Sequence, residues 1–542
     1  MSPTAVVIGL DGAAWHLLEP LIDHGHMPRL AALRASGAWG TLASTVPTYT
    51  PPAWTSAVTG VNPGRHGVYG FIEGNAQSER QELMHSGKIR SASIWQMANA
   101  QGKRIGVYNV PLTYPPQNVE GWMVSGMLTP GYGEHQRGFA TWDKAGGGAA
   151  LEARILEWAP NYVLDVNANY EQDWRDDGLC KTALASLEQR YRVLEGLLDM
   201  DPPDVLFSVL EGPDRLQHVY YRYMDPSDPL YETDEARAIR PAIEKCFAAM
   251  DRIVGLLADH ASSDGGVVVC SDHGFTAWEV SVHTNALLES WGLLKLKPSA
   301  RAMQSGVARS LVPVAKRFLP RKVARQAKGR TFSAIDWSRT KAFASPIPQQ
   351  GIFVNLAGRE PHGIVAERDL ALVKDELVAH FEELTDASGN KVTDRVYRSE
   401  DVFHGEALAG APDVLPVLRD HRFELDDEVF HREPFTDLRH LPRGVHHPDG
   451  IVIVAGRSIQ ASRRISGSVM DVTPTLLHLA GLEVPEDLDG SVLEDAFDPE
   501  ALKDRPVRMT APLSSGAGED ASPYSAEEEA MIEESLRGLG YL

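Results

Sequence analysis

The sequence predicts an α/β protein in which helices sandwich a central, mostly parallel sheet, with inserted cap regions. Short, continuously apolar runs rich in valine and isoleucine recur along the 542 residues. Such runs are typical of strands buried on both faces of a parallel sheet. Helical sequence separates several of these runs, as in α/β folds. Two long, heterogeneous stretches between the core pieces have the character of insertions.

The predicted strands are spread over most of the chain. A helical stretch around residues 17–36 follows the first of them. The runs that we assign to strands are Ala5 to Leu10, Arg104 to Val110, Val205 to Leu210, Gly266 to Cys270 and Gly450 to Ala455.

The same pattern divides the chain into an α/β core, two insertions or caps, and a tail. The tail is expected to be a flexible linker that ends in a short acidic helix. The ranges are 1–127, 202–283 and 444–513 for the core, 128–201 and 284–443 for the caps, and 514–542 for the tail.

The chain is acidic, with 52 basic and 74 acidic residues and a formal charge of -22. This balance argues against binding to a nucleic-acid duplex. An anionic substrate remains compatible with it if metal ions supply local positive charge. We expect a cytoplasmic protein without a transmembrane segment, because the sequence has no signal-peptide pattern, no long apolar run and only three widely spaced cysteines.

One segment reverses the acidic balance. Residues 301–341 contain eleven basic residues and a single acidic one, Asp336. Apolar residues at three- and four-residue steps predict an amphipathic basic helix within this segment. The helix could form a lid over an anionic substrate or a peripheral contact with an anionic membrane. It could equally pack on the acidic body of its own protein.

Asp11 and Thr50 are the first candidate site residues. Asp11 ends the first predicted strand, so its carboxylate should project at the carboxyl end of the sheet, where ligands of open α/β folds bind. Thr50 precedes two prolines and stands at the start of a helix, where the positive helix end favours an anion. Taken alone, Asp11 could belong to an ordinary turn and Thr50 could be an ordinary helix cap.

Two further predicted strands end in carboxylates and imidazoles. In a helix starting near Pro213, Asp214 and His218 would share one face at a spacing suited to one metal ion, or they would be a solvated helix face. Asp272 and His273 follow directly after another buried strand. Adjacent carboxylate and imidazole groups there are costly to bury unless they are paired or bound to metal.

A last candidate, His446, lies just before the strand at 450–455, and His447 is the alternative to it. Mixed nitrogen and oxygen donors suit zinc best, with manganese possible. Two metal ions about 4 Å apart would stabilise the attacking and leaving oxygens of a phosphoryl transfer. The proposed metal ligands are Asp11, Thr50, Asp214, His218, Asp272, His273 and His446.

The order of these residues resembles the alkaline phosphatase superfamily. The segment from Pro47 to Gly60 is similar to the nucleophile segment of type I phosphodiesterases and nucleotide pyrophosphatases. Residues 336–342 and 355–361 resemble a prokaryotic branch described only as predicted phosphohydrolases or phosphomutases. The similarity extends over most of the core, from Val6 to about Leu493.

The resemblance implies an alkaline phosphatase-like fold and a hydrolase of phosphodiesters, nucleotide pyrophosphates or phosphomonoesters. Thr50 would be the nucleophile, forming a phosphothreonine intermediate that water hydrolyses. One of two zinc ions would be bound by Asp11, Thr50, Asp272 and His273. The other would be bound by Asp214, His218 and His446.

Two other functions fit the same residues. A phosphomutase or phosphotransferase of this superfamily would return the phosphoryl group to an acceptor. A catalytically silent protein would bind an anion or a membrane surface through residues 301–341. Nucleotide pyrophosphatases also carry an asparagine that contacts a phosphate oxygen, and alignment without gaps places Phe71 there, with Asn75 out of register. The substrate is therefore expected to be a small phosphate ester whose class the sequence leaves open.

Overall fold

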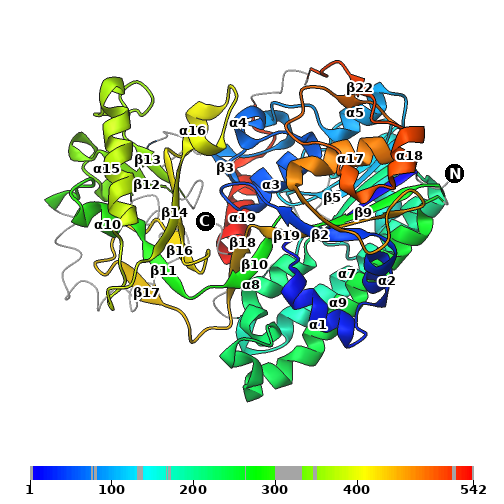
Figure 1. Cartoon of the computed structure of the whole chain (residues 1–542), viewed down its shortest axis with the longest axis horizontal. Coiled ribbons are helices and arrows are strands. Elements are labelled where there is room, and N and C mark those ends of the chain that lie inside the picture. The colour runs from blue at the N-terminus through cyan, green and yellow to red at the C-terminus, as the bar shows by residue number, and fades with distance from the viewer. Residues whose placement is uncertain are drawn as a thin grey trace. The chain divides into compact units, whose positions relative to one another are not determined.

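The structure is a computed structural model of the chain (Figure 1). It describes residues 4–74, 77, 82–130, 138–166, 168, 173–262, 264–298, 332–345, 351–514 and 521–539. Residues 301–331, which hold most of the predicted basic helix, lie outside these ranges. Among the residues that the structure describes, no helix is long and apolar enough to cross a membrane.

Contacts divide the chain into two compact units. Unit 1 comprises Met1–Val68, Leu83–Ala277 and Pro442–Leu542, and unit 2 comprises Tyr69–Glu82 and Trp278–Leu441. The segment 128–201, for which the sequence suggested a cap, is part of unit 1. The predicted cap at 284–443 falls almost wholly in unit 2.

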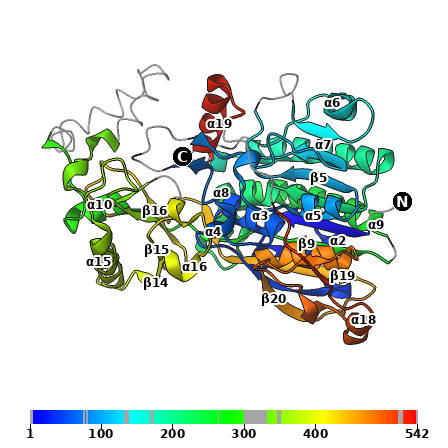
Figure 2. The ribbon, with the colours of Figure 1, turned by 90° about the horizontal axis from the view of Figure 1, so that it is seen from above.

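Unit 1 is built on a nine-stranded sheet with the order β20-β2-β19-β9-β1-β8-β5-β6-β7. Figure 2 shows this succession from β20 through β19 and β9 to β5. Strand β19 is antiparallel to β2 and β9, and β7 is antiparallel to β6, while the other strands all run in one direction. The strands are β1 (Ala5–Leu10), β2 (Ala38–Ala43), β5 (Ile105–Val110), β6 (Gly121–Ser125), β7 (Ala140–Trp142), β8 (Val205–Leu210), β9 (Gly266–Cys270), β19 (Asp449–Gly456) and β20 (Arg464–Ser468).

Helices cover both faces of this sheet, as Figure 1 shows. On one face lie α3 (Thr50–Thr59), α5 (Ile94–Ala100) and α17 (Val472–Leu479). On the other lie α2 (Pro28–Ser36), α7 (Gly178–Met200) and α9 (Asp234–His260). Every residue of β1, β5, β8 and β9 is buried, because side chains alternate between two covered faces. The prediction of a mostly parallel sheet sandwiched by helices is confirmed.

Two details differ from the sequence prediction. The helical stretch at 17–36 is two helices, α1 (Trp15–Asp23) and α2, because Pro28 starts a new helix. Strand β19 is antiparallel to both of its neighbours, a direction that its continuous apolar sequence could not reveal. The short acidic helix predicted for the tail is present as α19 (Ala526–Gly538), with Ile532 and Leu536 buried.

Unit 2 has its own hydrophobic core. Its four-stranded antiparallel sheet has the order β12-β13-β15-β14, and α15 (Leu370–Glu382) packs on it. A three-stranded sheet has the order β16-β11-β17, and α10 (Thr284–Ser290) follows β11. The strands are β11 (Val280–His283), β12 (Ala342–Ala344), β13 (Ile352–Val354), β14 (Thr393–Arg398), β15 (Val414–Leu418), β16 (Phe423–Asp426) and β17 (Phe435–Asp437).

Candidate metal centre

The carboxyl ends of β9, β1 and β8 lie side by side in the sheet of unit 1. Asp11 directly follows β1, and Asp272 and His273 follow β9. After β8 the chain enters α8 (Gly212–Met224), which carries Asp214 and His218 one turn apart. Because parallel strands end at the same edge, these five side chains meet there.

Two other elements bring the remaining candidates to this edge. Thr50 is the first residue of α3. His446 lies on β18 (Gly444–His447), which pairs with β10 (Gly274–Ala277) so that His446 stands opposite Phe275. All seven candidate residues are buried. The structure thus brings together every residue that the sequence proposed for the site.

Asp214, His218 and His446 form a first cluster of ligand atoms. The Nε2 atoms of the two imidazoles are 2.9 Å apart. Asp214 Oδ1 lies 3.3 Å from His218 Nε2 and 3.2 Å from His446 Nε2. The three ligand atoms lie within 4.8 Å of one another, as the donors of one metal ion would.

The hydrogen bonds of the two imidazoles strengthen this assignment. His218 Nδ1 lies 3.2 Å from the carbonyl oxygen of Gly444, and His446 Nδ1 lies 3.2 Å from that of Thr48. A carbonyl oxygen only accepts, so we assign the proton of each ring to Nδ1. In the neutral rings both Nε2 lone pairs then face each other and Asp214. Such an arrangement needs a cation, which is a metal ion or, without one, an added proton.

Asp11, Thr50, Asp272 and His273 form a second cluster. His273 Nε2 lies 3.2 Å from Thr50 Oγ1, 3.3 Å from Asp272 Oδ2 and 3.7 Å from Asp11 Oδ1. His273 Nδ1 lies 3.1 Å from the carbonyl oxygen of Gly274, so Nε2 again offers its lone pair to the cluster. Asp214 also comes within 4.8 Å of Asp11 and His273, so its carboxylate lies between the two clusters.

The carboxylates of the second cluster fit a bound cation. Asp11 Oδ1 and Asp272 Oδ2 are buried, and neither accepts a hydrogen bond from any described residue. Their other oxygens do accept, from Trp54 Nε1 at 2.9 Å and from the backbone N–H of Gly12 at 3.1 Å. Each carboxylate is therefore oriented by one oxygen and presents the other to the centre. Buried acceptors without donors are costly unless a cation meets them.

Burial shifts the pKa values of these groups in the metal-free protein. It raises the pKa of Asp11, with a further rise from the nearby carboxylate of Asp272, and it likewise raises the pKa of Asp272. It lowers the pKa of His273 and of His218, which keeps both rings neutral, the form that binds metal.

Asp214 behaves differently from the other two carboxylates. Burial alone would raise its pKa, but the contacts with His218, His446 and Arg215 hold it well below the usual value. Asp214 is therefore the most readily ionised of the three carboxylates in the metal-free protein.

The start of α3 corrects one expectation about Thr50. Tyr49, not Thr50, is the N-cap residue, and Thr50 is the first helical residue. Pro51 and Pro52 have no N–H, and the N–H of Ala53 bonds to the carbonyl of Tyr49 at 3.1 Å. Of the first three helical residues only Thr50 has an N–H, so an anion here would gain from that group and from the helix dipole.

Sequence reasoning missed the residues that support the centre. Trp54 lies one turn after Thr50 on the same face of α3, which is a spacing that could have suggested it. Gln217 donates from Nε2 to the carbonyl of Gly12 at 2.7 Å. Arg215, which directly follows Asp214, donates to the Asp214 carboxylate. No sequence pattern pointed to Gln217 or Arg215.

The alternatives named from the sequence lie elsewhere. His447 is partly exposed and pairs with Asp449, so His446 is the residue within the cluster. Phe71 is buried in unit 2. Asn75 lies outside the described residues.

Fold and site together define a member of the alkaline phosphatase superfamily. The family model of type I phosphodiesterase / nucleotide pyrophosphatase matches residues 5–425, and the chain belongs to this family. It is an enzyme, a metal-dependent phosphoric ester hydrolase. Family membership sets aside the alternative of a catalytically silent binding protein.

Solved structures are similar to this chain, and the first of them shares its fold. Phosphonoacetate hydrolase from Sinorhizobium meliloti 1021, in complex with phosphonoformate, is similar with a TM-score of 0.54 and 17% identity, over 88% of this chain and 96% of that chain. Human ectonucleotide pyrophosphatase / phosphodiesterase 5 is similar with a TM-score of 0.48 and 14% identity, over 91% of this chain and 100% of that chain. A comparison with curated protein sequences gave no match.

Proposed function

We propose that the chain hydrolyses a small phosphate ester at a two-metal centre, with Thr50 as the nucleophile. One observation carries the proposal. Lone pairs of His218, His446 and His273 converge on the same buried space as carboxylate oxygens that lack donors. With the carboxylates ionised and the ring protons on Nδ1, the hydroxyl of Thr50 is the one side-chain donor that the seven proposed ligands offer to these acceptors, whereas two divalent cations would satisfy them.

The two clusters suggest how the ions are shared. Asp214, His218 and His446 would hold one, and Asp11, Thr50, Asp272 and His273 the other. Zinc suits both sets, because each mixes imidazole nitrogen with carboxylate oxygen. Bound zinc would supply Lewis-acid chemistry that lowers the pKa of a hydroxyl group and neutralises charge on the phosphoryl oxygens.

The chain's own residues then define the reaction. Thr50 Oγ would attack phosphorus, its proton passing to solvent, and the bond from phosphorus to the ester oxygen would break. The released alcohol takes up a proton. The resulting phosphothreonine would be hydrolysed when water attacks the same phosphorus, which restores Thr50. The N-terminus of α3 favours the negative phosphoryl group beside Thr50.

Metal content and hydrolysis rates test this proposal together. Purified protein would be assayed for zinc and manganese and for turnover of p-nitrophenyl phosphate, bis-p-nitrophenyl phosphate and the p-nitrophenyl ester of thymidine monophosphate. Phosphonoacetate belongs in the panel because a protein of the same fold hydrolyses it. We expect about two metal ions per chain and turnover of at least one phosphate ester. Absence of bound metal and of any turnover after zinc or manganese is added would refute the proposal.

The transferase alternative has its own test. Turnover in the presence of ethanol, glycerol or a sugar would be followed by phosphate release and by product analysis. A hydrolase releases one phosphate for each ester cleaved. Transfer of most of the phosphoryl groups to the added alcohol would instead favour the phosphotransferase.

A further inference from the structure

Arg215 connects the metal centre to a carboxylate outside it. Its guanidinium donates through Nη1 to Asp214 Oδ2, while Asp214 Oδ1 faces His218 and His446. Its other edge donates to Asp165, from Nε to Oδ1 at 3.2 Å and from Nη2 to Oδ2 at 3.0 Å. The side chain of Arg215 is only 2% exposed.

This arrangement matches the geometry of guanidinium. The planar fork binds Asp165 through two parallel hydrogen bonds, which fixes the plane of the guanidinium as well as its position. The remaining nitrogen then holds one oxygen of Asp214. Because that oxygen is occupied, the carboxylate presents the other oxygen to the two imidazoles in a fixed orientation.

We propose that Arg215 is a positioning residue that sets the orientation of the metal ligand Asp214, and that Asp165 in turn fixes Arg215. The inference rests on the proposed metal centre. Outer partners that orient metal ligands commonly contribute about 10- to 100-fold to metal affinity or activity.

The positive charge of Arg215, considered alone, predicts the opposite effect on metal affinity from a positioning role. The two roles can therefore be distinguished by experiment. A positive charge next to a metal ligand repels an incoming divalent cation. If Arg215 acted only through its charge, its removal would strengthen metal binding. If it orients Asp214, its removal weakens metal binding.

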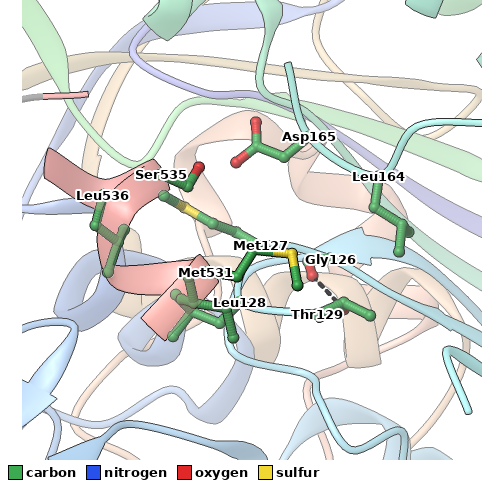
Figure 3. A pocket seen from close by; sticks show the side chains of 10 residues that line it. Gly126, Met127, Leu128, Thr129, Leu164, Asp165, Met531, Ser535 and Leu536 are labelled. Carbon is green, nitrogen blue, oxygen red and sulfur yellow. Dashed lines mark hydrogen bonds between the residues drawn. The ribbon is translucent and has the colours of Figure 1, made fainter. Parts of the chain in front are cut away.

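Asp165 provides a second, independent place to test the proposal. It lines a pocket with Met127 and Leu164 and with Met531, Ser535 and Leu536 of α19 (Figure 3). Asp165 is not one of the proposed metal ligands. Its replacement by asparagine removes the charge and one of the two oxygens that accept from Arg215, and it leaves the centre's own side chains in place.

The experiment compares R215M, R215K and D165N with the wild-type protein. Zinc affinity of the EDTA-treated proteins would be measured by competition with a chromophoric chelator, and the visible spectrum of cobalt-loaded protein would report ligand geometry. R215K keeps the charge but cannot hold both carboxylates through a planar fork. Arg154→Met removes a surface arginine paired with Glu157 on α6 (Gly147–Trp158) and is the control. Circular dichroism would establish that each variant is folded.

We expect zinc to bind about 10- to 100-fold more weakly to R215M and R215K, with a smaller loss in D165N. The cobalt spectrum would change in all three and stay unchanged in Arg154→Met. If R215M fails to fold, R215K and D165N still decide the question. Unchanged or tighter zinc binding, with an unchanged cobalt spectrum, would overturn the positioning role.

The outcomes separate this inference from the proposed function. Wild-type protein that hydrolyses phosphate esters while the variants keep normal zinc affinity refutes the role of Arg215 alone. Wild-type protein that binds zinc without turnover refutes the proposed function alone, and the affinities of the variants still test Arg215. Wild-type protein that binds no metal refutes both.

Discussion

Asp272 Oδ2 lies 3.3 Å from His273 Nε2, and once Asp272 is ionised neither atom has a proton to offer the other. The ring proton of His273 is on Nδ1, bonded to the carbonyl of Gly274. Two acceptors therefore face each other in a buried site, and Asp272 Oδ2 accepts no hydrogen bond from the described residues. A cation between them would turn this conflict into a favourable interaction.

We predict that Asp272→Asn stabilises the metal-free protein and abolishes turnover. An amide nitrogen in place of Oδ2 can donate to His273 Nε2, and the repulsion between the carboxylates of Asp272 and Asp11 disappears. The free energy of unfolding of the metal-free protein should rise by about 1 kcal/mol. The variant should lose the stabilisation that zinc gives to the wild type.

Thermal and urea unfolding with EDTA and with zinc would measure both effects. Asp251→Asn is the control, since both carboxylate oxygens of buried Asp251 accept backbone N–H groups, from Arg29 and Leu30. That change should destabilise the protein with or without zinc. If the metal-free Asp272→Asn protein were as unstable as Asp251→Asn, the conclusion that Asp272 Oδ2 faces another acceptor in the metal-free site would be wrong.

Thr50→Ala should reduce turnover by on the order of 10^6-fold, as expected when a nucleophile is removed. Thr50→Ser keeps a hydroxyl at the same place and should retain measurable activity. Brief incubation with a labelled ester and rapid acid quenching should leave phosphate on the wild-type protein and none on Thr50→Ala. Thr59→Ala is the control, because Thr59 is also buried in α3 and its hydroxyl, among the described residues, bonds only to the carbonyl of Thr55. Equal activity of Thr50→Ala and Thr59→Ala would exclude Thr50 as nucleophile.

Gly12→Ala should damage both stability and metal binding. Gly12 has a φ of 69°, and a Cβ there would lie 2.6 Å from the ring of Phe275. Gly25 has a φ of 80° and no atom within 4 Å of a built Cβ. Gly25→Ala should therefore cost only the backbone strain, about 1 kcal/mol.

The overlap with Phe275 should destabilise Gly12→Ala by about 1–3 kcal/mol more than Gly25→Ala. Movement of the Gly12 N–H away from Asp272 should also weaken zinc binding. Urea unfolding and the zinc competition assay would be applied to both variants. If the two alanine variants match in stability and in zinc affinity, the close approach at Gly12 has no role.

His66 should make the protein sensitive to acid. Burial lowers its pKa from 6.5 to about 3. The unfolded chain takes up a proton near pH 6.5 and the folded protein only near pH 3, so stability falls as the pH is lowered through that window. At pH 5 the loss from this residue should be roughly 2 kcal/mol relative to pH 7.

Urea unfolding of metal-free wild type and His66→Gln at pH 7 and pH 5 would measure this difference. The variant should lose less stability on acidification than the wild type. His24→Gln, at an exposed histidine, is the control and should follow the wild type. Equal losses in wild type and His66→Gln would show that the pKa of His66 changes little on unfolding.

Much of the fold could be read from the sequence because it depends on local patterns. The sequences of β1, β8 and β9 are continuously apolar, and this composition is typical of strands that are covered on both faces. The direction of β19 could not be predicted in this way, because a buried strand has the same composition whichever way it runs. Its pairing with β2 and β9 is a long-range contact.

The sequence by itself determined which side chains could carry the chemistry, because a carboxylate or imidazole at the end of a buried strand must find a partner. The tertiary structure alone decided that Asp11, Asp214, His218, Asp272, His273 and His446 surround Thr50 within one buried space. It also decided which atoms support them. Arg215, Asp165 and Trp54 act through orientation at hydrogen-bond distance, and orientation arises only when segments far apart in the chain are packed together.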